Sequence, residues 1–171
     1  VCSSDLSNDA DNSLDTVAIV DGSVLTSGTV LTLAATTGHI VPAGKLTLAA
    51  KTGVYIADSL TLYAASNKAL VINADADSTG TSGTLTVAST KTVTSAKSDV
   101  TITAWDLDMA GSLTAGTMGI TIHGAEATQT IGIGLTTLNM ALDDAEIGRL
   151  TAEAGLNIGS STSGSIKVTG V

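Results

Sequence analysis

Aromatic residues are almost absent from this sequence. Its 171 residues include no Phe, one Trp and two Tyr, which makes the aromatic share 2%. Because 43% of the residues are nevertheless hydrophobic, the composition excludes an intrinsically disordered chain. The core must therefore be built from Leu, Ile, Val and Ala, whose small or branched side chains suit thin cores of stacked strands.

Proline and cysteine are equally scarce. The sequence has one Pro against 18 Gly and many Thr and Ser residues, a composition that favours short strands joined by tight turns and predicts an all-β fold. Cys2 is the only cysteine, so no internal disulfide can form. A chain without disulfides fits the cytosol and also fits bacterial exoproteins that cross an outer membrane unfolded.

Charged residues make up only 13% of the chain, and 16 acidic residues against 7 basic ones give a net charge of −9. This charge repels phosphate backbones, so we expect no nucleic-acid partner. The longest apolar runs have about six residues, whereas a membrane-spanning helix needs about 20. The sequence therefore predicts no membrane span.

The first residues need separate treatment. Residues 1–6, VCSSDL, resemble the conceptual translation of a common sequencing-adapter end, GTG TGC TCT TCC GAT CT. We therefore expect residues 1–12 to be an artefact followed by a disordered start, and we exclude them from the fold; a native disordered start is the alternative. An adapter would mark the sequence as a truncated metagenomic fragment, in which a missing secretion signal carries no information.

Short, similar blocks recur along the rest of the chain. In each block apolar residues alternate with Thr or another small residue, as in 31–35, 46–50, 60–64, 85–88 and 100–103. This period of two places Leu31 and Leu33 on one face of a strand and Thr32 on the other. Gly or a polar residue follows nearly every block, as a turn requires.

The spacing of these blocks indicates the architecture. An apolar pair arrives about every seven or eight residues, so three strands make a coil of about 22 residues. We therefore predict a parallel β-helix (β-solenoid) over residues 13–171 as a single domain, with a polar loop at residues 73–83 that is too hydrophilic to bury. An antiparallel sandwich is the competing fold, but Asn-Gly is absent and Asp21-Gly22 is the one Asp-Gly pair.

The carboxy-terminal stretch adds a resemblance to a known family. Residues 143–152 (DDAEIGRLTA) and 155–168 (GLNIGSSTSGSIKV) resemble a unit that recurs in filamentous-haemagglutinin-like β-strand-repeat exoproteins. The specific match is confined to this stretch, and the rest of the chain resembles the family in rhythm and composition. The resemblance implies a right-handed winding, secretion to the bacterial cell surface and an adhesive role. The family's amino-terminal secretion domain has no counterpart in this sequence.

Few residues suggest chemistry. His39 and His123 lie far apart and lack the spacing of a zinc site, so we expect both to point outward from strands. β-Helical polysaccharide lyases and hydrolases would need clustered carboxylates beside a basic residue. Asp106 and Asp108 share a strand face without a basic neighbour, and Arg149 is the only arginine. We expect these two aspartates to be solvated, and we predict no catalytic residue and no cofactor.

Two acidic segments have structural alternatives. Asp143, Asp144, Glu146 and Arg149 either form a recognition patch or belong to a short helical turn at residues 141–150 with an acidic start and a Glu146–Arg149 pair; we favour the turn.

The loop residues Asn73, Asp75 and Asp77 place oxygen atoms at alternate positions, as calcium loops do, but the closing Glu of the EF-hand is missing. They are weak calcium candidates, and a solvated loop without metal is the preferred interpretation. Trp105, Tyr55 and Tyr63 would suit sugar stacking if they were exposed together.

These observations favour one function over another. The preferred hypothesis is a structural or adhesive segment of a large secreted bacterial surface protein, without catalysis. Its expected partners are neighbouring repeats of the same polypeptide and host-cell or matrix glycans or proteins. The alternative is a fragment of a β-helical polysaccharide lyase or hydrolase.

Overall fold

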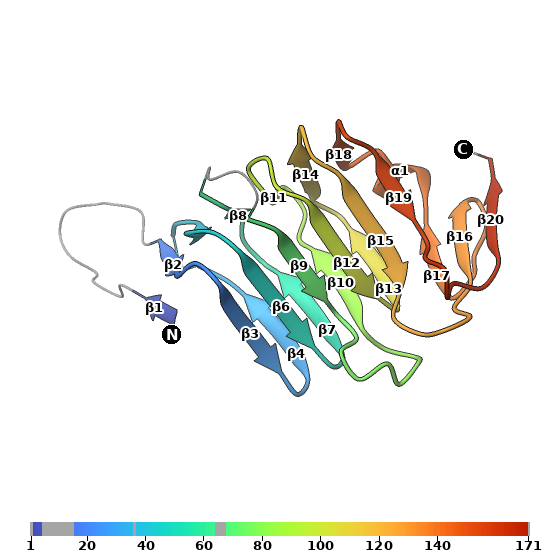
Figure 1. The fold of residues 1–171 in the computed structure, drawn as a ribbon, viewed down its shortest axis with the longest axis horizontal. Helices are drawn as coiled ribbons and strands as arrows, with labels where there is room; N and C mark the ends of the chain where they lie inside the picture. Colours follow the sequence, from blue (N-terminus) through green and yellow to red (C-terminus); the bar gives the residue numbers. More distant parts are fainter. Residues whose placement is uncertain (1, 5–15, 36, 64–67, 171) are drawn as a thin grey trace.

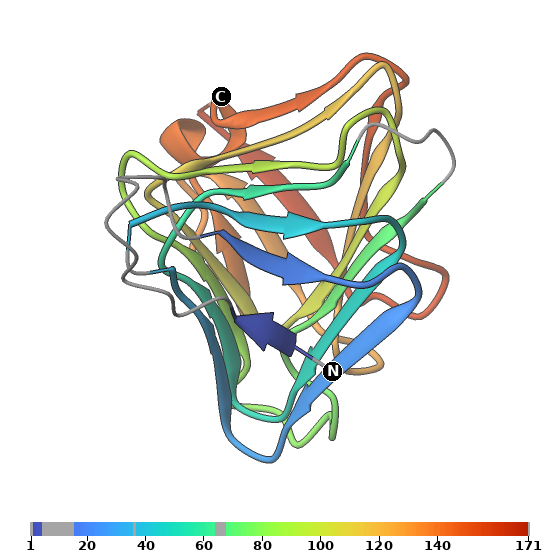
Figure 2. The same cartoon turned by 90° about the vertical axis from the view of Figure 1, so that its left-hand side faces the viewer.

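The computed structural model describes residues 2–4, 16–35, 37–63 and 68–170. The chain winds through three parallel sheets in turn, and from β2 to β13 each turn of the winding adds one strand to each sheet (Figures 1 and 2). The predicted all-β class is confirmed, and the parallel sheets stacked in register are consistent with the predicted parallel β-helix. The right hand of the winding stays a prediction.

Sheet A has seven strands in the order β1-β2-β5-β8-β11-β14-β18. Their bounds are β1 (Cys2–Ser4), β2 (Val17–Ile19), β5 (Ile40–Pro42), β8 (Leu60–Thr61), β11 (Thr92–Thr94), β14 (Ser112–Gly116) and β18 (Leu150–Ala152). All neighbours are parallel except β1, which pairs antiparallel with β2. Part of the segment expected to be disordered thus pairs with a sheet edge, while residues 1 and 5–12 lie outside the described residues.

Sheets B and C complete each coil. Sheet B contains β3 (Ser23–Ser27), β6 (Leu46–Ala50), β9 (Leu70–Asn73), β12 (Val100–Ala104), β15 (Ile120–Gly124) and β19 (Leu156–Ile158). Sheet C contains β4 (Val30–Leu33), β7 (Gly53–Ile56), β10 (Thr84–Val87) and β13 (Asp106–Met109). Every pair of neighbours in these two sheets is parallel and without a register shift.

The strand register places similar residues next to one another in successive coils. In sheet B one inward column runs through Leu48, Ile72, Ile102 and Ile122, all fully buried. Thr101 and Thr121 pair on the outer face. The alternation of apolar and hydroxyl residues therefore sorts the side chains into a core and a surface, and each coil buries its apolar side chains against the coils above and below it.

The coil length is close to the predicted value where no segment is inserted. Leu25 pairs with Leu48 in the next coil, and Ile102 pairs with Ile122. The coil that leads from Ile72 to its partner Ile102 is longer, because residues 74–83 form a loop between β9 and β10. Asn73, the first residue of the predicted loop, belongs to β9 instead. One side chain of that loop departs from the expectation, since Asp75 is fully buried.

The carboxy-terminal end is built differently. Sheet D has the order β17-β16-β20, formed by β17 (Met140–Leu142), β16 (Ile131–Gly134) and β20 (Ile166–Thr169). Helix α1 (Asp144–Ile147) lies between β17 and β18 and confirms the predicted helical turn. Its Asp143 and Glu146 form a capping box, in which each side chain accepts a hydrogen bond from the other residue's backbone N–H.

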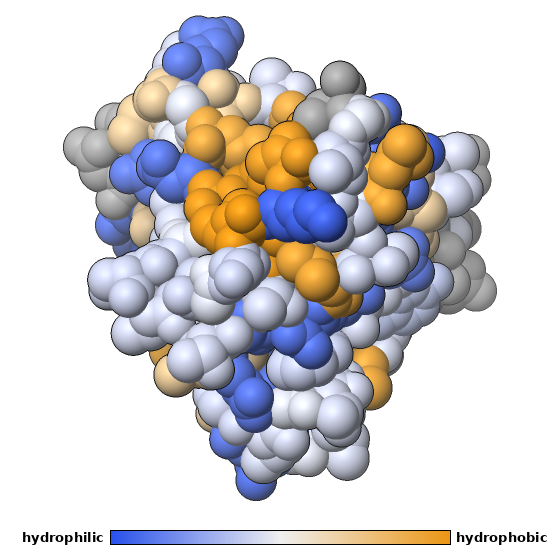
Figure 3. All heavy atoms as spheres, turned by 90° about the vertical axis from the view of Figure 1, so that its right-hand side faces the viewer, coloured by the Kyte–Doolittle hydropathy of each residue, from blue (hydrophilic) through white to orange (hydrophobic). Residues whose placement is uncertain are grey.

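Apolar side chains gather on this end of the molecule (Figure 3). Leu135, Ile166 and Val168 are 81%, 45% and 55% exposed. Val168 pairs with Ile133 across sheet D, and β20 is the edge strand of that sheet. Among the described residues, β20 therefore forms an open edge of sheet D with apolar side chains along it.

Candidate functional site

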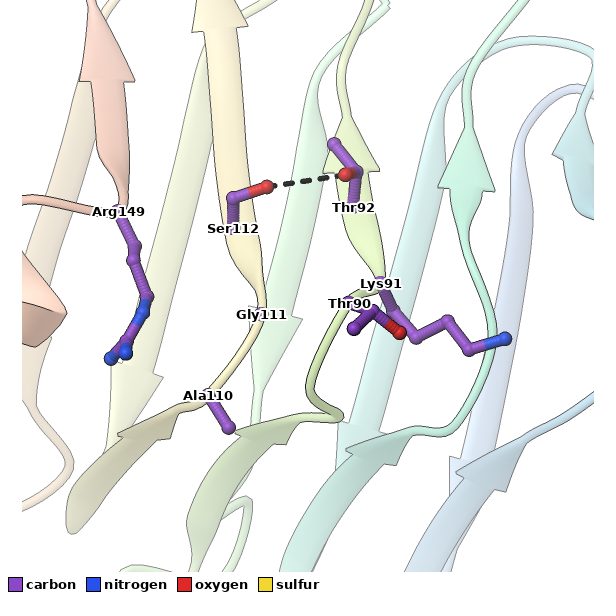
Figure 4. A pocket seen from close by; sticks show the side chains of 7 residues that line it. All are labelled: Thr90, Lys91, Thr92, Ala110, Gly111, Ser112 and Arg149. Carbon is purple, nitrogen blue, oxygen red and sulfur yellow. Dashed lines mark hydrogen bonds between the residues drawn. The ribbon is translucent and has the colours of Figure 1, made fainter.

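A shallow depression of about 220 Å³ lies where the chain turns from sheet C into sheet A. Its lining comes from three coils and consists of Thr90, Lys91, Thr92, Ala110, Gly111, Ser112 and Arg149 (Figure 4). Gly111 forms part of the floor, where a Cβ atom would overlap the carbonyl oxygens of Ala88 and Lys91. Only glycine permits this close approach of two coils.

Both cations of the depression are directed at partners within the protein. Lys91 Nζ lies 2.5 Å from Asp58 Oδ1, and its side chain extends away from the depression in Figure 4. Arg149 Nη1 donates to the carbonyl oxygen of Met109 over 2.8 Å. Thr92 Oγ1 and Ser112 Oγ share a hydrogen bond of 3.1 Å. The lining thus offers hydroxyls and two engaged cations, without a carboxylate.

Two carboxylates that contact β13 or belong to it, Glu146 and Asp106, have backbone partners. Glu146 accepts hydrogen bonds from Met109 N through Oε1 and from Asp143 N through Oε2. Asp106 Oδ1 accepts from Ala141 N over 3.0 Å. Burial raises the pKa of both carboxyls above the ordinary range, and repulsion from Asp143 and then from Asp106 adds to the effect on Glu146.

This arrangement bears on the catalytic alternative. An acid and base pair acting on a sugar needs carboxyl oxygens that are free to reach the substrate. Both oxygens of Glu146 accept hydrogen bonds from backbone N–H groups, and Asp106 accepts one from Ala141 in β17. The two groups thus have structural partners, so nothing in this corner favours catalysis over a structural role.

The structure corrects two expectations in this region. Asp108 is exposed as predicted, but Asp106 is half-buried because β17 packs beside it. Glu146 and Arg149 do not form an ion pair, since the ion pairs among the described residues are Lys51–Asp77, Lys68–Asp21 and Lys91–Asp58. Both side chains instead bind the backbone of Met109, which no local sequence signal indicates.

The histidines and aromatic residues are dispersed. His39 is exposed, and His123 lies on the outer face of β15, with Nε2 3.3 Å from Thr103 Oγ1. Tyr55 and Tyr63 are 39% and 71% exposed, but Tyr55 belongs to sheet C and Tyr63 follows β8 of sheet A. Trp105 lies between β12 and β13. The three aromatic residues therefore occupy different parts of the coil.

Acidic side chains also join neighbouring coils. Asp58 accepts from Ala35 N and from Lys91 Nζ, and Asp21 accepts from Lys45 N and from Lys68 Nζ. Their hydrogen bonds to the lysines, and then to the backbone amides, lower the pKa of both carboxyls. These side chains connect one coil to the next. Both sites are solvent-accessible, so each ion pair by itself contributes little to the free energy of unfolding.

The outer face of sheet A carries a column of hydroxyl groups. Thr61, Thr94, Thr114 and Thr151 pair in register along four successive strands. The alternation in the sequence predicted outward-facing threonines, and the register of sheet A aligns these four from coil to coil. Threonine presents a hydroxyl and a methyl group together, so the column is an uncharged surface able to make hydrogen bonds and apolar contacts.

The weak calcium candidates lie at the corner between sheets B and C. Asn73 Oδ1 accepts a hydrogen bond from Asp75 N over 3.2 Å, and Asp77 Oδ1 accepts from the hydroxyl of Thr79. Over the described parts of the chain, no three His, Cys, Asp or Glu residues approach closely enough to form a metal cluster by themselves. No helix in the same residues is long and apolar enough to cross a membrane.

No family model matches this chain, and neither a curated protein nor a solved structure does.

Proposed function

We propose that this chain is a structural segment of a long rod on the surface of a bacterial cell. The observation that carries the proposal is the in-register stacking of the coils, exemplified by the buried column through Leu48, Ile72, Ile102 and Ile122. Such a core grows by one layer with every coil, so its length is set by the number of repeats. Secretion and the bacterial origin are supported by the resemblance of residues 143–168 to filamentous-haemagglutinin-like exoproteins.

The polar groups support the same role. The depression lined by Lys91 and Arg149 has no carboxylate, and both cations bind protein groups. Asp21 and Asp58 join coils to one another. Polar side chains used in this way reinforce a scaffold, whereas a catalytic centre needs reactive groups that face a substrate.

A coil duplication tests the structural proposal. Residues 100–119 form one complete coil, because Val100 pairs with Ile120. Inserting a second copy after residue 119 should give a rod that still unfolds cooperatively, with a urea m-value increased in proportion to the added buried surface. The matched control inserts the same segment in scrambled order. A duplicated chain that unfolds no more cooperatively than the scrambled one would exclude a modular rod.

We further propose that the threonine column of sheet A is an adhesive surface for host-cell or matrix glycans or proteins. Uncharged hydroxyls in a regular row can bind such partners without the cost of desolvating a charge. Beads coated with the chain should bind arrayed glycans or matrix proteins. Thr94→Asp with Thr114→Asp should abolish binding, while Thr101→Asp with Thr121→Asp on sheet B should leave it intact. Equal binding by both variants would refute the assignment.

A further inference from the structure

The corner between sheets B and C buries a carboxylate without a partner. Asp75 follows β9 directly and is 0% exposed. Among the described residues, neither of its carboxylate oxygens has a hydrogen-bond partner, although the N–H of Thr79 lies near them without reaching hydrogen-bond geometry. Because an unpaired charge in an apolar site is strongly unfavourable, buried carboxylates are found paired, protonated or bound to a metal ion.

The surroundings of Asp75 add negative charge. Burial raises the pKa of Asp75 above its ordinary value, and the neighbouring Asp77 and then Glu126 raise it further. Asp77 belongs to the same projecting loop, whereas Glu126 comes from the corner that follows β15. A Cβ atom on Gly80 would overlap the carboxylate of Glu126, so this side chain lies directly against the loop.

Among the described residues, Lys51 is the cation that pairs with an acidic side chain of this corner. Lys51 Nζ lies 3.9 Å from Asp77 Oδ2, and its side chain is 54% exposed. A single solvated ammonium group at this distance compensates only part of the charge of Asp77, and the two oxygens of Asp75 stay without a partner. The corner therefore places the negative charges of Asp77 and Glu126 near a buried carboxylate that no hydrogen bond satisfies among the described residues.

We propose that this corner binds a Ca²⁺ ion, with Asp75 and Asp77 as direct ligands and Glu126 as a third acidic group at its border. Calcium takes six to eight oxygen ligands in flexible geometry and accepts hydroxyls, backbone carbonyls and water beside carboxylates. The Thr79 hydroxyl, the carbonyls of the loop and water supply the remaining ligands. The hydrogen bond from Asp75 N to Asn73 Oδ1 fixes the backbone at the start of the loop.

The proposed site explains a gap in the sequence pattern. The loop lacks the closing glutamate of an EF-hand, and the winding of the chain brings Glu126 to the loop from a later coil, against Gly80. A bound ion would hold the loop between β9 and β10 in one conformation, and its charge would offset that of Glu126 beside it. It would thereby stiffen this side of the rod.

Thermal unfolding of the full chain tests the proposal. In buffer with about 5 mM Ca²⁺ the melting temperature should exceed that in EDTA by at least ~2 °C. The same concentration of Mg²⁺ should have a smaller effect, because Mg²⁺ requires octahedral geometry and retains its water. A calcium effect no larger than that of Mg²⁺ would overturn the proposal.

Asp75→Asn separates calcium binding from simple protonation of the buried carboxyl. The variant should melt above the wild type in EDTA, since it removes an unpaired charge, and should lose the calcium shift. Asp108→Asn removes an exposed carboxylate from β13 and should keep that shift. If Asp75→Asn does not fold, calorimetric titration of Asp77→Asn with Ca²⁺ replaces it, with at least a tenfold loss of affinity expected. A full calcium effect in the variant tested would overturn the proposal.

Discussion

The backbone N–H of Met109 donates a hydrogen bond of 3.1 Å to Glu146 Oε1, although the two residues are 37 positions apart in the sequence. Met109 ends β13, the edge strand of sheet C, and its carbonyl oxygen accepts from Arg149 Nη1. Two side chains in and beyond α1 thus satisfy backbone groups that a neighbouring strand would otherwise bind. The segment of residues 143–149 acts as a cap on that edge.

Removing the Glu146 carboxylate should therefore destabilise the protein. Glu146→Ala leaves the amides of Met109 and Asp143 without their acceptors, which should lower the free energy of unfolding by about 2 kcal/mol. Urea denaturation measures the loss. Glu146→Gln keeps an acceptor oxygen and should lose less. Glu153→Ala removes an exposed charge and serves as the control; an equal loss in that variant would mean that the cap contributes nothing.

The assignment of inside and outside makes a second prediction. Leu48 is fully buried in the core, and the adjacent Thr47 lies on the outer face of β6. Leu48→Asp should unfold the rod or lower its stability by several kcal/mol, because the new charge has no partner in a dry column. Thr47→Asp should cost far less. Comparable losses in the two variants would show that the faces have been exchanged.

Sequence patterns could predict the repetitive part of the fold because each strand repeats the same chemistry. The alternation in Leu46-Thr47-Leu48 indicates a strand and its inner face, and the recurrence of such blocks indicates the coil. The stacked columns follow from these two features.

The contacts between irregular segments could not be predicted in this way. Glu146 and Met109 are distant in sequence, and their contact depends on how α1 lies against β13. The polarity of residues 73–83 correctly indicated a loop but missed the burial of Asp75, because the corner that covers it comes from another coil.

The raised pKa of Asp106 gives a third prediction. Burial is its main cause, opposed by the hydrogen bond from Ala141 N and reinforced by Asp108. A carboxyl whose pKa is higher in the folded than in the unfolded chain loses its stabilising contribution as the pH rises through the raised value. Asp106→Asn, which can retain the acceptor oxygen, should therefore be more stable than the wild type at about pH 7 and no more stable below about pH 3.8.

Urea denaturation of Asp106→Asn and the wild type across this pH range provides the measurement. Asp108→Asn is the control, since its exposed side chain should change stability little at either pH. A constant difference between Asp106→Asn and the wild type would contradict an effect of ionisation.

The apolar carboxy-terminal end predicts slow self-association. Strand β20 exposes Ile166 and Val168 beside the free edge of sheet D, and such edges pair with other chains. The net charge of −9 opposes association, so raising the ionic strength should accelerate it by screening. Light scattering against concentration measures the process.

Ile166→Lys with Val168→Lys should keep the chain monomeric at high salt. Thr47→Lys with Thr61→Lys adds the same charge on other strands and should associate like the wild type. If the two double variants associate at the same rate, any change from the wild type is due to net charge alone.

The central claim is the parallel, in-register stacking of successive coils, and a disulfide measures it most directly. Thr101 and Thr121 are paired on adjacent strands of sheet B, and Asn157 follows one strand further. Adjacent strands lie about 4.8 Å apart, within the range that a disulfide can bridge, whereas two strand spacings exceed it. In a Cys2→Ser background, mild oxidation should close a disulfide in Thr101→Cys/Thr121→Cys and should leave both thiols free in Thr101→Cys/Asn157→Cys. Equal cross-linking of the two variants, or cross-linking of the second alone, would contradict the stacking.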